Sequence, residues 1–427
     1  MPDLTWGLLG PEALPSLRRT RTLGLGAAVR SFNDLAVPGL GGVWFGKQIL
    51  LALIGVHVAA QAGARKIEVA NAVEALACWL AFKNRNWTPD PRLRGNRKLR
   101  ARSDISFNAA RQHSFYVSQP MRMATVQVLP ALGLVKARSA RFNDFTCTRA
   151  GTELVQAATE PFRPYNRSLL DHLLLWVRGE EGRIDTAALH RALSPVEPLP
   201  EAAAVILHDR LVRGGPQESP DTTNRRRDAL QWIESRRTDP HTPISWNTRP
   251  IAIRTEEHWQ DLHAGALFFG TRNAALTVLE ALELRMPAER KLALDGQLAT
   301  SLEQPLAQLR RAADGFLNLQ HADEPASIFC RECSNEDALS ILRGLVGRDD
   351  RVLRLQGTHI CTGPAFRGGV IRATENEDEE GAATRSNPCG FPGDISPRIS
   401  NLFWLNLDLR GELDRHLVAQ VQEGDDQ

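Results

Sequence analysis

The strongest pattern in this chain is a pair of apolar helical periodicities, in residues 47–61 and 66–83. Apolar side chains recur three or four positions apart in both segments, and residues with that spacing share one face of a helix. Gly63 interrupts the chain between the two segments, so the sequence predicts an antiparallel helix hairpin. The positions that carry the two patterns are Leu50, Leu53, Ile54, His57, Val69, Val73, Leu76, Ala77 and Leu80.

A second pattern covers residues 103–157. It predicts a helix over residues 105–112, a turn marked by Ser118 and Pro120, and a helix over residues 121–132. Strands over residues 133–138 and 141–147 and a further helix follow. Pro120 suits a first helical turn, where its missing N–H costs nothing. Thr148 can cap the last helix by accepting a hydrogen bond from a backbone N–H two or three residues on.

This order of helix, turn, helix, hairpin and helix resembles a winged helix, and the run ALGLVKARSARFNDFTCTRAGTELV is similar to the wing and exit helix of that superfamily. The resemblance implies that the second helix enters the major groove of DNA and that the hairpin grips the flanking backbone. Because that helix is mostly apolar, we expect little sequence-specific readout, and protein contact is an alternative use of the module. The implied contacts are Arg111, Arg122, Arg138 and Arg141, with Thr125 and Gln127 as base readers.

Positive charge is concentrated at the front of the chain. Residues 1–160 hold 21 Lys and Arg against 10 Asp and Glu, giving +11, whereas residues 161–320 hold 20 against 21 and residues 321–427 hold 11 against 19. A basic N-terminal part and an acidic C-terminal part predict that the N-terminal part binds a polyanion. The alternative is that the two ends pair with each other, within one chain or between neighbouring copies.

The most basic segment is residues 84–102, where Asp90 is the only acidic residue. Its prolines and glycine predict a loop. Phosphate contacts by such residues release condensed counterions and provide affinity without sequence specificity. Trp87 is a candidate for stacking on an unpaired base, or else it anchors the loop. The candidate nucleic-acid contacts in this segment are Arg85, Trp87, Arg92, Arg94, Arg97, Lys98, Arg100 and Arg102.

The middle of the chain is predicted to be helical and carries no catalytic motif. We expect helices over residues 167–177, 185–193 (capped by Asp185), 200–211, 224–237, 256–284 and 287–320. In the last hundred residues, the sequence pattern predicts strands over 351–355 and 369–372, and an apolar strand or helix over 399–409.

Four of the six cysteines lie in that last part of the chain. Cys330 and Cys333 form a CxxC, while Cys361, preceded by His359, and Cys389 follow at intervals of 27 intervening residues. Thiolates and imidazoles are the ligands of tetrahedral zinc, so Cys330, Cys333, His359, Cys361 and Cys389 are candidate ligands. The alternatives are isolated reduced cysteines or a redox pair.

The composition fits a large intracellular protein. A chain of 427 residues with 42% hydrophobic and 24% charged residues is long enough for two to four domains. The longest apolar run, residues 49–60, is too short to cross a bilayer as a helix, and the N-terminus lacks a secretory signal pattern. We therefore expect a cytoplasmic bacterial protein with no membrane partner.

These patterns predict a mainly α fold with small β parts (α+β) in three domains. They are a basic N-terminal domain with the winged-helix-like segment (1–160), a helical domain (161–320) and an acidic, cysteine-containing α/β module (321–427). The predicted function is a nucleic-acid-associated adaptor that binds DNA or RNA with little sequence specificity. One alternative is a non-enzymatic structural subunit of a bacterial multiprotein complex, such as an antiviral defence or mobile-element system. Its partners would be other protein subunits or further copies of the same chain. A second alternative is a nuclease or other hydrolase with dispersed site residues.

Overall fold

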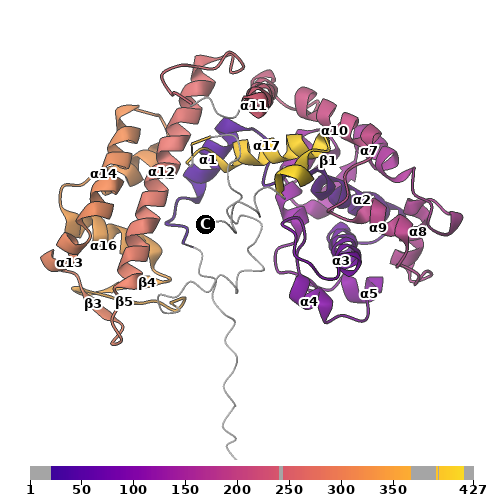
Figure 1. Cartoon of the computed structure of the whole chain (residues 1–427), viewed down its shortest axis with the longest axis horizontal. Coiled ribbons are helices and arrows are strands. Elements are labelled where there is room, and N and C mark those ends of the chain that lie inside the picture. Colours follow the sequence, from indigo (N-terminus) through magenta and orange to yellow (C-terminus); the bar gives the residue numbers. More distant parts are fainter. Residues whose placement is uncertain (1–20, 240–243, 367–390, 393, 418–427) are drawn as a thin grey trace, which may run out of the picture. The chain divides into compact units, whose positions relative to one another are not determined.

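The computed structural model describes residues 21–239, 244–366, 391–392 and 394–417. The chain divides into two compact units (Figure 1). Unit 1 comprises Met1–Arg30 and Leu267–Ile371, and unit 2 comprises Ser31–Ala266 and Arg372–Gln427. Helices α1 and α12 run across the two unit boundaries. The predicted division into three domains remains a prediction, and the units here are each assembled from two separate stretches of sequence.

The described residues of unit 2 are almost entirely helical, and the one sheet among them is the short hairpin of β1 and β2. Its elements are α1 (Gly26–Ala36), α2 (Gly46–Ala62), α3 (Lys66–Asn84), α4 (Asn96–Arg100), α5 (Phe107–Ala110), η1 (Met121–Thr125), α6 (Val128–Ala131), β1 (Val135–Ala137), η2 (Phe142–Asp144), β2 (Phe145–Cys147), α7 (Arg149–Thr159), η3 (Pro164–Asn166), α8 (Leu169–Arg178), α9 (Ala187–Leu193), α10 (Glu201–Arg213), α11 (Pro220–Thr238), the first part of α12 (Glu256–Leu284) and α17 (Pro397–Leu409).

Unit 1 contains the second part of α12, a set of helices and a small antiparallel sheet with strand order β3-β5-β4. Helix α16 packs on β4, and α14 packs on α15 (Figure 1). The further elements are β3 (Lys291–Ala293), α13 (Gly296–Ser301), α14 (Glu303–Asn318), α15 (Glu324–Cys333), α16 (Ala338–Asp349), β4 (Leu353–Gln356) and β5 (His359–Thr362). The expected mainly α fold with small β parts is confirmed at this level.

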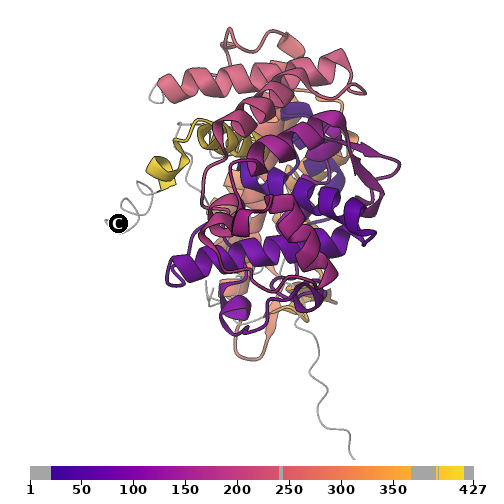
Figure 2. The same cartoon turned by 90° about the vertical axis from the view of Figure 1, so that its right-hand side faces the viewer.

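The predicted helix hairpin is the centre of unit 2. Helix α2 packs along α3, and Gly63 ends α2 in the left-handed conformation, at a φ of 65°. The two helices approach closely at Gly55, where a Cβ atom would lie 2.5 Å from Cα of Ala70. Helix α2 is buried on nearly all sides, as expected of a helix that is apolar all round. Figure 2 shows the helices of unit 2 from the side that lies at the right of Figure 1.

Residues 103–157 contain the predicted elements in the predicted order, although most are shorter. The hairpin is confirmed: Val135 pairs with Cys147 and Ala137 with Phe145 in antiparallel register. Thr148 caps α7 and accepts a 3.1 Å hydrogen bond from the backbone N–H of Gly151. The second predicted helix is divided into the 3-10 turn η1 and the single turn α6. The winged-helix resemblance itself remains a prediction.

Several predicted boundaries differ from the structure. Helix α9 is capped by Thr186 instead of Asp185, because the Thr186 hydroxyl accepts the N–H of Leu189. The helix predicted over residues 287–320 is instead β3, α13 and α14, with Asp295 capping α13. The basic segment contains the short helix α4, and residues 397–409 form a helix. The strand predicted over residues 369–372 lies outside the described residues.

An N-terminal arginine completes the interior of unit 1. The Arg21 guanidinium contacts Glu283 at the end of α12, at 2.9 Å, and Asp349 at the end of α16, at 3.2 Å. Its side chain is 8% exposed, and both carboxylates are almost fully buried. Because buried charges persist only when they are paired, this cluster fixes residues 21–25 to the C-terminal half of the chain.

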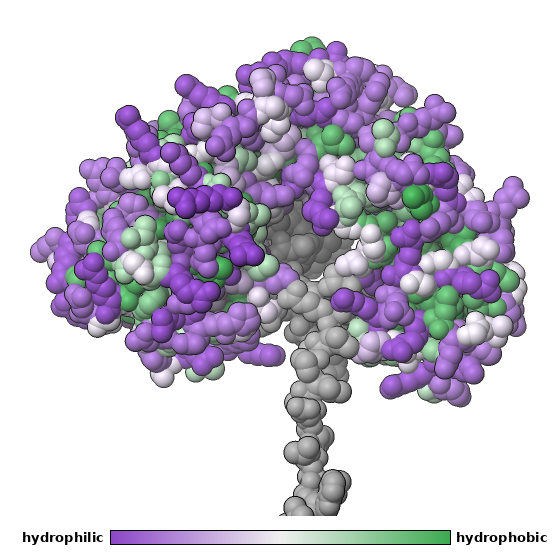
Figure 3. All heavy atoms as spheres, turned by 180° about the vertical axis from the view of Figure 1, so that it is seen from behind, coloured by the Kyte–Doolittle hydropathy of each residue, from purple (hydrophilic) through white to green (hydrophobic). Residues whose placement is uncertain are grey.

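The surfaces of the two units in the view of Figure 3 are mostly hydrophilic, with hydrophobic residues in small, scattered patches. Within the described part of the chain, no helix has the length and apolar character needed to span a membrane.

Candidate nucleic-acid interface

Arg92, a predicted phosphate contact, is used within the fold of unit 2. It is buried, and Nη2 contacts Asp90 at 2.9 Å and Asp414 at 2.7 Å, while Nη1 donates to the Val196 carbonyl at 3.2 Å. Arg85 lies 3.7 Å from the same Asp90 carboxylate. Because buried guanidinium groups are retained for such pairing, Arg92 connects the basic segment to the C-terminal part of unit 2.

Two further predicted arginines also have partners inside unit 2. Nη1 of Arg94 donates to the Gln119 carbonyl at 2.9 Å. Nε of Arg122 donates to Oδ1 of Asn71 at 2.5 Å, and the Arg122 guanidinium lies over the ring of Phe142. Both side chains are half-buried, so they position the segments that carry the exposed cations.

Trp87 lies against the end of α3. Its ring stacks on Phe82 with a centroid distance of 5.6 Å and an interplanar angle of 9°. The backbone N–H of Trp87 donates to the Phe82 carbonyl at 2.7 Å, and Nδ2 of Asn96 donates to the Trp87 carbonyl at 3.3 Å. The structure therefore places Trp87 as the residue that holds the basic segment on α3.

The remaining predicted cations reach the surface of unit 2. Arg111 pairs with Glu68 at 3.3 Å, and Arg102 lies over the ring of Phe115. Within the described residues, the other predicted cations at this surface make no ion pair. We call the following set the α3 basic residues: Arg97, Arg100, Arg102, Arg111, Arg138 and Arg141, which are exposed, and Lys98, which is half-buried.

Helix α3 supports all the segments that carry these residues. The elements α4, α5, η1 and η2 each pack against it. At its N-terminal end, Asn143 receives hydrogen bonds from Nζ of Lys66 (2.7 Å) and from the backbone N–H of Ile67 (3.0 Å), which fixes the hairpin that carries Arg138 and Arg141. At its other end lies α4, with Arg97 and Arg100. A 19-residue helix is about 28 Å long. The cations are therefore spread over a distance comparable to the length of several nucleotides.

The surface around η1 is hollowed on two sides. Arg122 and Met123 line both a cavity of about 220 Å³, shared with Asn71 and His113, and a cavity of about 430 Å³, shared with Arg141. The Met123 side chain is 53% exposed between them. Of the base readers implied by the winged-helix resemblance, Thr125 is buried and its hydroxyl donates to the Arg122 carbonyl, whereas Gln127 accepts a hydrogen bond from Arg398.

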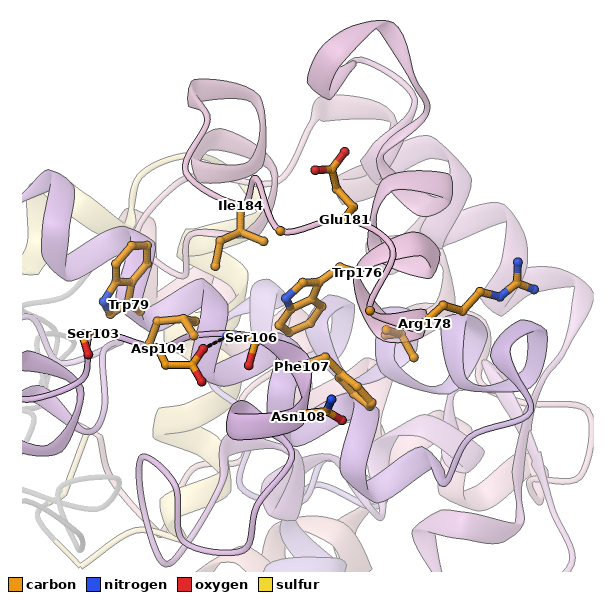
Figure 4. A pocket seen from close by; sticks show the side chains of 14 residues that line it. Trp79, Ser103, Asp104, Ser106, Phe107, Asn108, Trp176, Arg178, Glu181 and Ile184 are labelled. Carbon is orange, nitrogen blue, oxygen red and sulfur yellow. Dashed lines mark hydrogen bonds between the residues drawn. The ribbon is translucent and has the colours of Figure 1, made fainter.

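A third cavity in unit 2 was not predicted from the sequence. It has a volume of about 370 Å³ and is lined by α3, the segment 103–108, the end of α8 and the segment 179–184. Three aromatic side chains form walls: Trp79, Phe107 and Trp176 (Figure 4). We call this cavity the tryptophan pocket. Its residues are far apart in sequence, and no local pattern connects them.

The tryptophan pocket contains polar groups as well as rings. Nε1 of Trp176 is buried and has no hydrogen-bond partner among the described residues. Oδ1 of Asp104 accepts the N–H of Ser106 at 2.8 Å, and these bonds from Ser106 hold the pKa of the exposed Asp104 carboxyl below its usual value. Hydrogen bonds from Arg183 lower the pKa of Glu181 to about 2. Both lining carboxylates are therefore ionised at neutral pH.

The cysteine candidates are divided between two elements of unit 1. Cys330 and Cys333 are buried in α15, and burial raises the pKa of the Cys330 thiol to about 12 and that of Cys333 further. His359 and Cys361 lie on β5, where Sγ of Cys361 is 3.3 Å from Oε1 of Gln356. Cys389 lies outside the described residues. In the part of the chain that is described, no three His, Cys, Asp or Glu residues are grouped to hold a metal ion.

Comparison with known proteins gives no relative from which a role for these sites follows. The chain matches no protein-family model, no curated protein and no solved structure.

Proposed function

We propose that this protein is a nucleic-acid-associated adaptor that binds DNA or RNA with little sequence specificity through the α3 basic residues. The observation that carries the proposal is that Arg97, Arg100, Arg138 and Arg141 are exposed and, within the described residues, make no ion pair. Many arginines elsewhere in unit 2 are paired with carboxylates, as Arg213 is with Asp209. Exposed cations without acidic neighbours are available to phosphate groups, whose neutralisation releases counterions.

The positions of the two implied base readers, Thr125 and Gln127, favour backbone contact over base recognition. Thr125 is buried, and the side chain of Gln127 is engaged by Arg398. Phosphate contacts position a protein on nucleic acid but carry no sequence information. We therefore expect similar affinity for unrelated sequences, with a strong dependence on salt.

The test compares two triple variants by fluorescence anisotropy on labelled 20-nucleotide single strands and duplexes. Arg97, Arg100 and Arg141 are replaced with Ala in the first variant, and the exposed Arg213, Arg331 and Arg415 in the control, so both lose three positive charges. We expect the first variant alone to lose affinity and to flatten the slope of log K against log salt by about one for each lost contact. Equal effects in both variants, or no binding by the unaltered protein at low salt, would contradict the proposal.

A second candidate function is a structural subunit that contacts other proteins through η1. Met123 favours it, because this side chain is 53% exposed and lies between two cavities, and methionine adapts well to partner surfaces. Met123→Ser separates the two functions, because it removes the apolar side chain without adding a charge beside Arg141. It should abolish protein contact at η1 in a pull-down with native lysate and leave the salt slope for nucleic acid unchanged.

A further inference from the structure

We propose that the tryptophan pocket takes one unpaired base of a single-stranded nucleic acid whose phosphates contact the neighbouring arginines. The inference rests on the proposed function and extends it, because it names the single strand as the preferred ligand. It follows from the walls of the pocket, from the polar groups in it and from the charges around it.

The walls fit a flat aromatic ligand. Trp79 and Trp176 come from different helices, α3 and α8, and Phe107 holds Trp176 in an edge-to-face contact with a centroid distance of 5.6 Å. The volume of about 370 Å³ is in the range of small-molecule sites. Every base has a π-face, so stacking on aromatic side chains is the usual way in which proteins hold unpaired bases.

The polar groups match the edge of a base. Figure 4 shows the indole nitrogen of Trp176 on the edge of its ring that faces Ser106 and Trp79. This buried donor has no hydrogen-bond partner in the described part of the chain, and a buried N–H without an acceptor is rare enough to need an explanation. A ring nitrogen or carbonyl oxygen of a base would supply the acceptor. The Asp104 carboxylate can accept from an exocyclic amine, as acidic side chains do from N4 of cytosine.

The charges separate the base from its phosphates. Asp104 lines the pocket and opposes the entry of a phosphate group, whereas the carboxylate of Glu181 is paired with Arg183 and Arg167. Positive charge lies outside the pocket: Arg178 is exposed and its guanidinium points away from Asp104 (Figure 4), and the basic segment ends at Arg102, next to the lining residue Ser103. A nucleotide can therefore place its base inside while its backbone runs over the surface toward the α3 basic residues.

This arrangement excludes a paired base. In a duplex, both faces of a base are stacked and its Watson–Crick edge is occupied, so the pocket can be filled only after unpairing. We therefore expect single strands to bind more tightly than duplexes, and cytosine or adenine, which carry an exocyclic amine, to bind more tightly than thymine.

The experiment measures the affinities of the full chain for oligo(dC)12, oligo(dT)12 and a 12-bp duplex at one salt concentration. Trp79→Leu should weaken oligo(dC) binding about tenfold, the loss expected for one stacked base, and leave duplex binding unchanged. Trp246→Leu is the control, because Trp246 is also half-buried in unit 2 but lies outside the pocket. Asp104→Asn keeps an acceptor for the Ser106 N–H and should reduce the preference for dC over dT.

Stacking is read directly from a 2-aminopurine placed in the oligonucleotide. Its fluorescence should be quenched on binding to the unaltered protein and restored with Trp79→Leu. Equal loss of dC and duplex affinity in Trp79→Leu, or no effect of Trp79→Leu and Asp104→Asn on any probe, overturns the pocket inference while the salt-dependent binding of the proposed function stands. Absence of binding to all three probes at low salt overturns both.

Discussion

The hydroxyl of Tyr116 donates a 2.6 Å hydrogen bond to the carboxylate of Glu74 inside unit 2. Both side chains are buried, and burial raises the pKa of Glu74 from its usual 4.5 to about 7 against the opposing effects of the Tyr116 bond and of Arg122. Oε1 of Glu74 has no hydrogen-bond partner among the described residues. The fold therefore favours the protonated form of a carboxyl group that lies beneath η1.

Glu74 makes the stability of unit 2 depend on pH. Between pH 4.5 and about 7 the folded chain keeps a proton that the unfolded chain has lost, so the free energy of unfolding falls as pH rises through this window. At 1.36 kcal/mol per pH unit the total is about 3 kcal/mol. Glu74→Gln removes this titration and can still accept from Tyr116. We expect the free energy of unfolding of the variant, relative to that of the unaltered protein, to rise by about this amount between pH 4.5 and 7.5.

The measurement is urea unfolding of both proteins across that pH range, with a probe in unit 2. Glu153→Gln is the control, because Glu153 lies on the surface of α7 in an i,i+4 pair with Arg149. Parallel pH profiles for Glu74→Gln and the unaltered protein would show that Glu74 is ionised in the fold at pH 5–7.

Gly55 sets the distance between α2 and α3. In Gly55→Ala the new Cβ would lie 2.5 Å from Cα of Ala70, and helix backbone cannot rotate away as a side chain can. Overpacking of about 1–3 kcal/mol then exceeds the gain of about 1 kcal/mol from helix propensity. We expect a net loss of about 1 kcal/mol, measured by hydrogen exchange of the α2 amides.

Gly344 provides the opposite case. It lies within α16, and no atom comes within 4 Å of a Cβ atom built there. Gly344→Ala should therefore stabilise α16 by up to about 1 kcal/mol. If both alanine variants changed stability in the same direction, the close approach at Gly55 would not be the cause of the loss.

Arg21 should be essential for unit 1. Arg21→Met leaves Glu283 and Asp349 without this guanidinium, and removal of one partner from buried ion pairs costs about 3–5 kcal/mol. Faster hydrogen exchange at the end of α12 and in α16 would report the loss. Arg331→Met is the control, because its pair with Glu324 is exposed and should contribute less than about 1 kcal/mol.

The cysteines should differ in reactivity. Burial holds the pKa of Cys330 near 12 and raises that of Cys333, and thiols react as thiolates. We expect Cys361, which is half-buried on β5, to react with Ellman's reagent before both residues of the CxxC. Zinc binding by Cys330, Cys333 and Cys361 with His359 or Cys389 remains a prediction, and elemental analysis tests it. Reaction of Cys330 that is accelerated by a chelator would favour a zinc site.

The sequence predicted the local elements whose pattern is repeated over many residues. The hairpin of α2 and α3 and the long helix α12 were predicted closely, since apolar spacing and a glycine stop act over neighbouring residues. The capping role of Thr148 was predicted for the same reason. The helix predicted over residues 287–320 was wrong because pattern alone did not show that Leu292 lies on a strand that pairs with the distant β5.

The sequence also identified the basic segment and its excess of arginine, because charge is a property of composition. Only the tertiary structure decided that Arg92 is buried against Asp414 while Arg97 and Arg100 remain exposed. It alone brought Trp79 and Trp176 to one pocket, and it alone paired Arg21 with Asp349. The physical reason is that pairing and burial depend on contacts between residues far apart in the chain, and such contacts form only when the helices pack together.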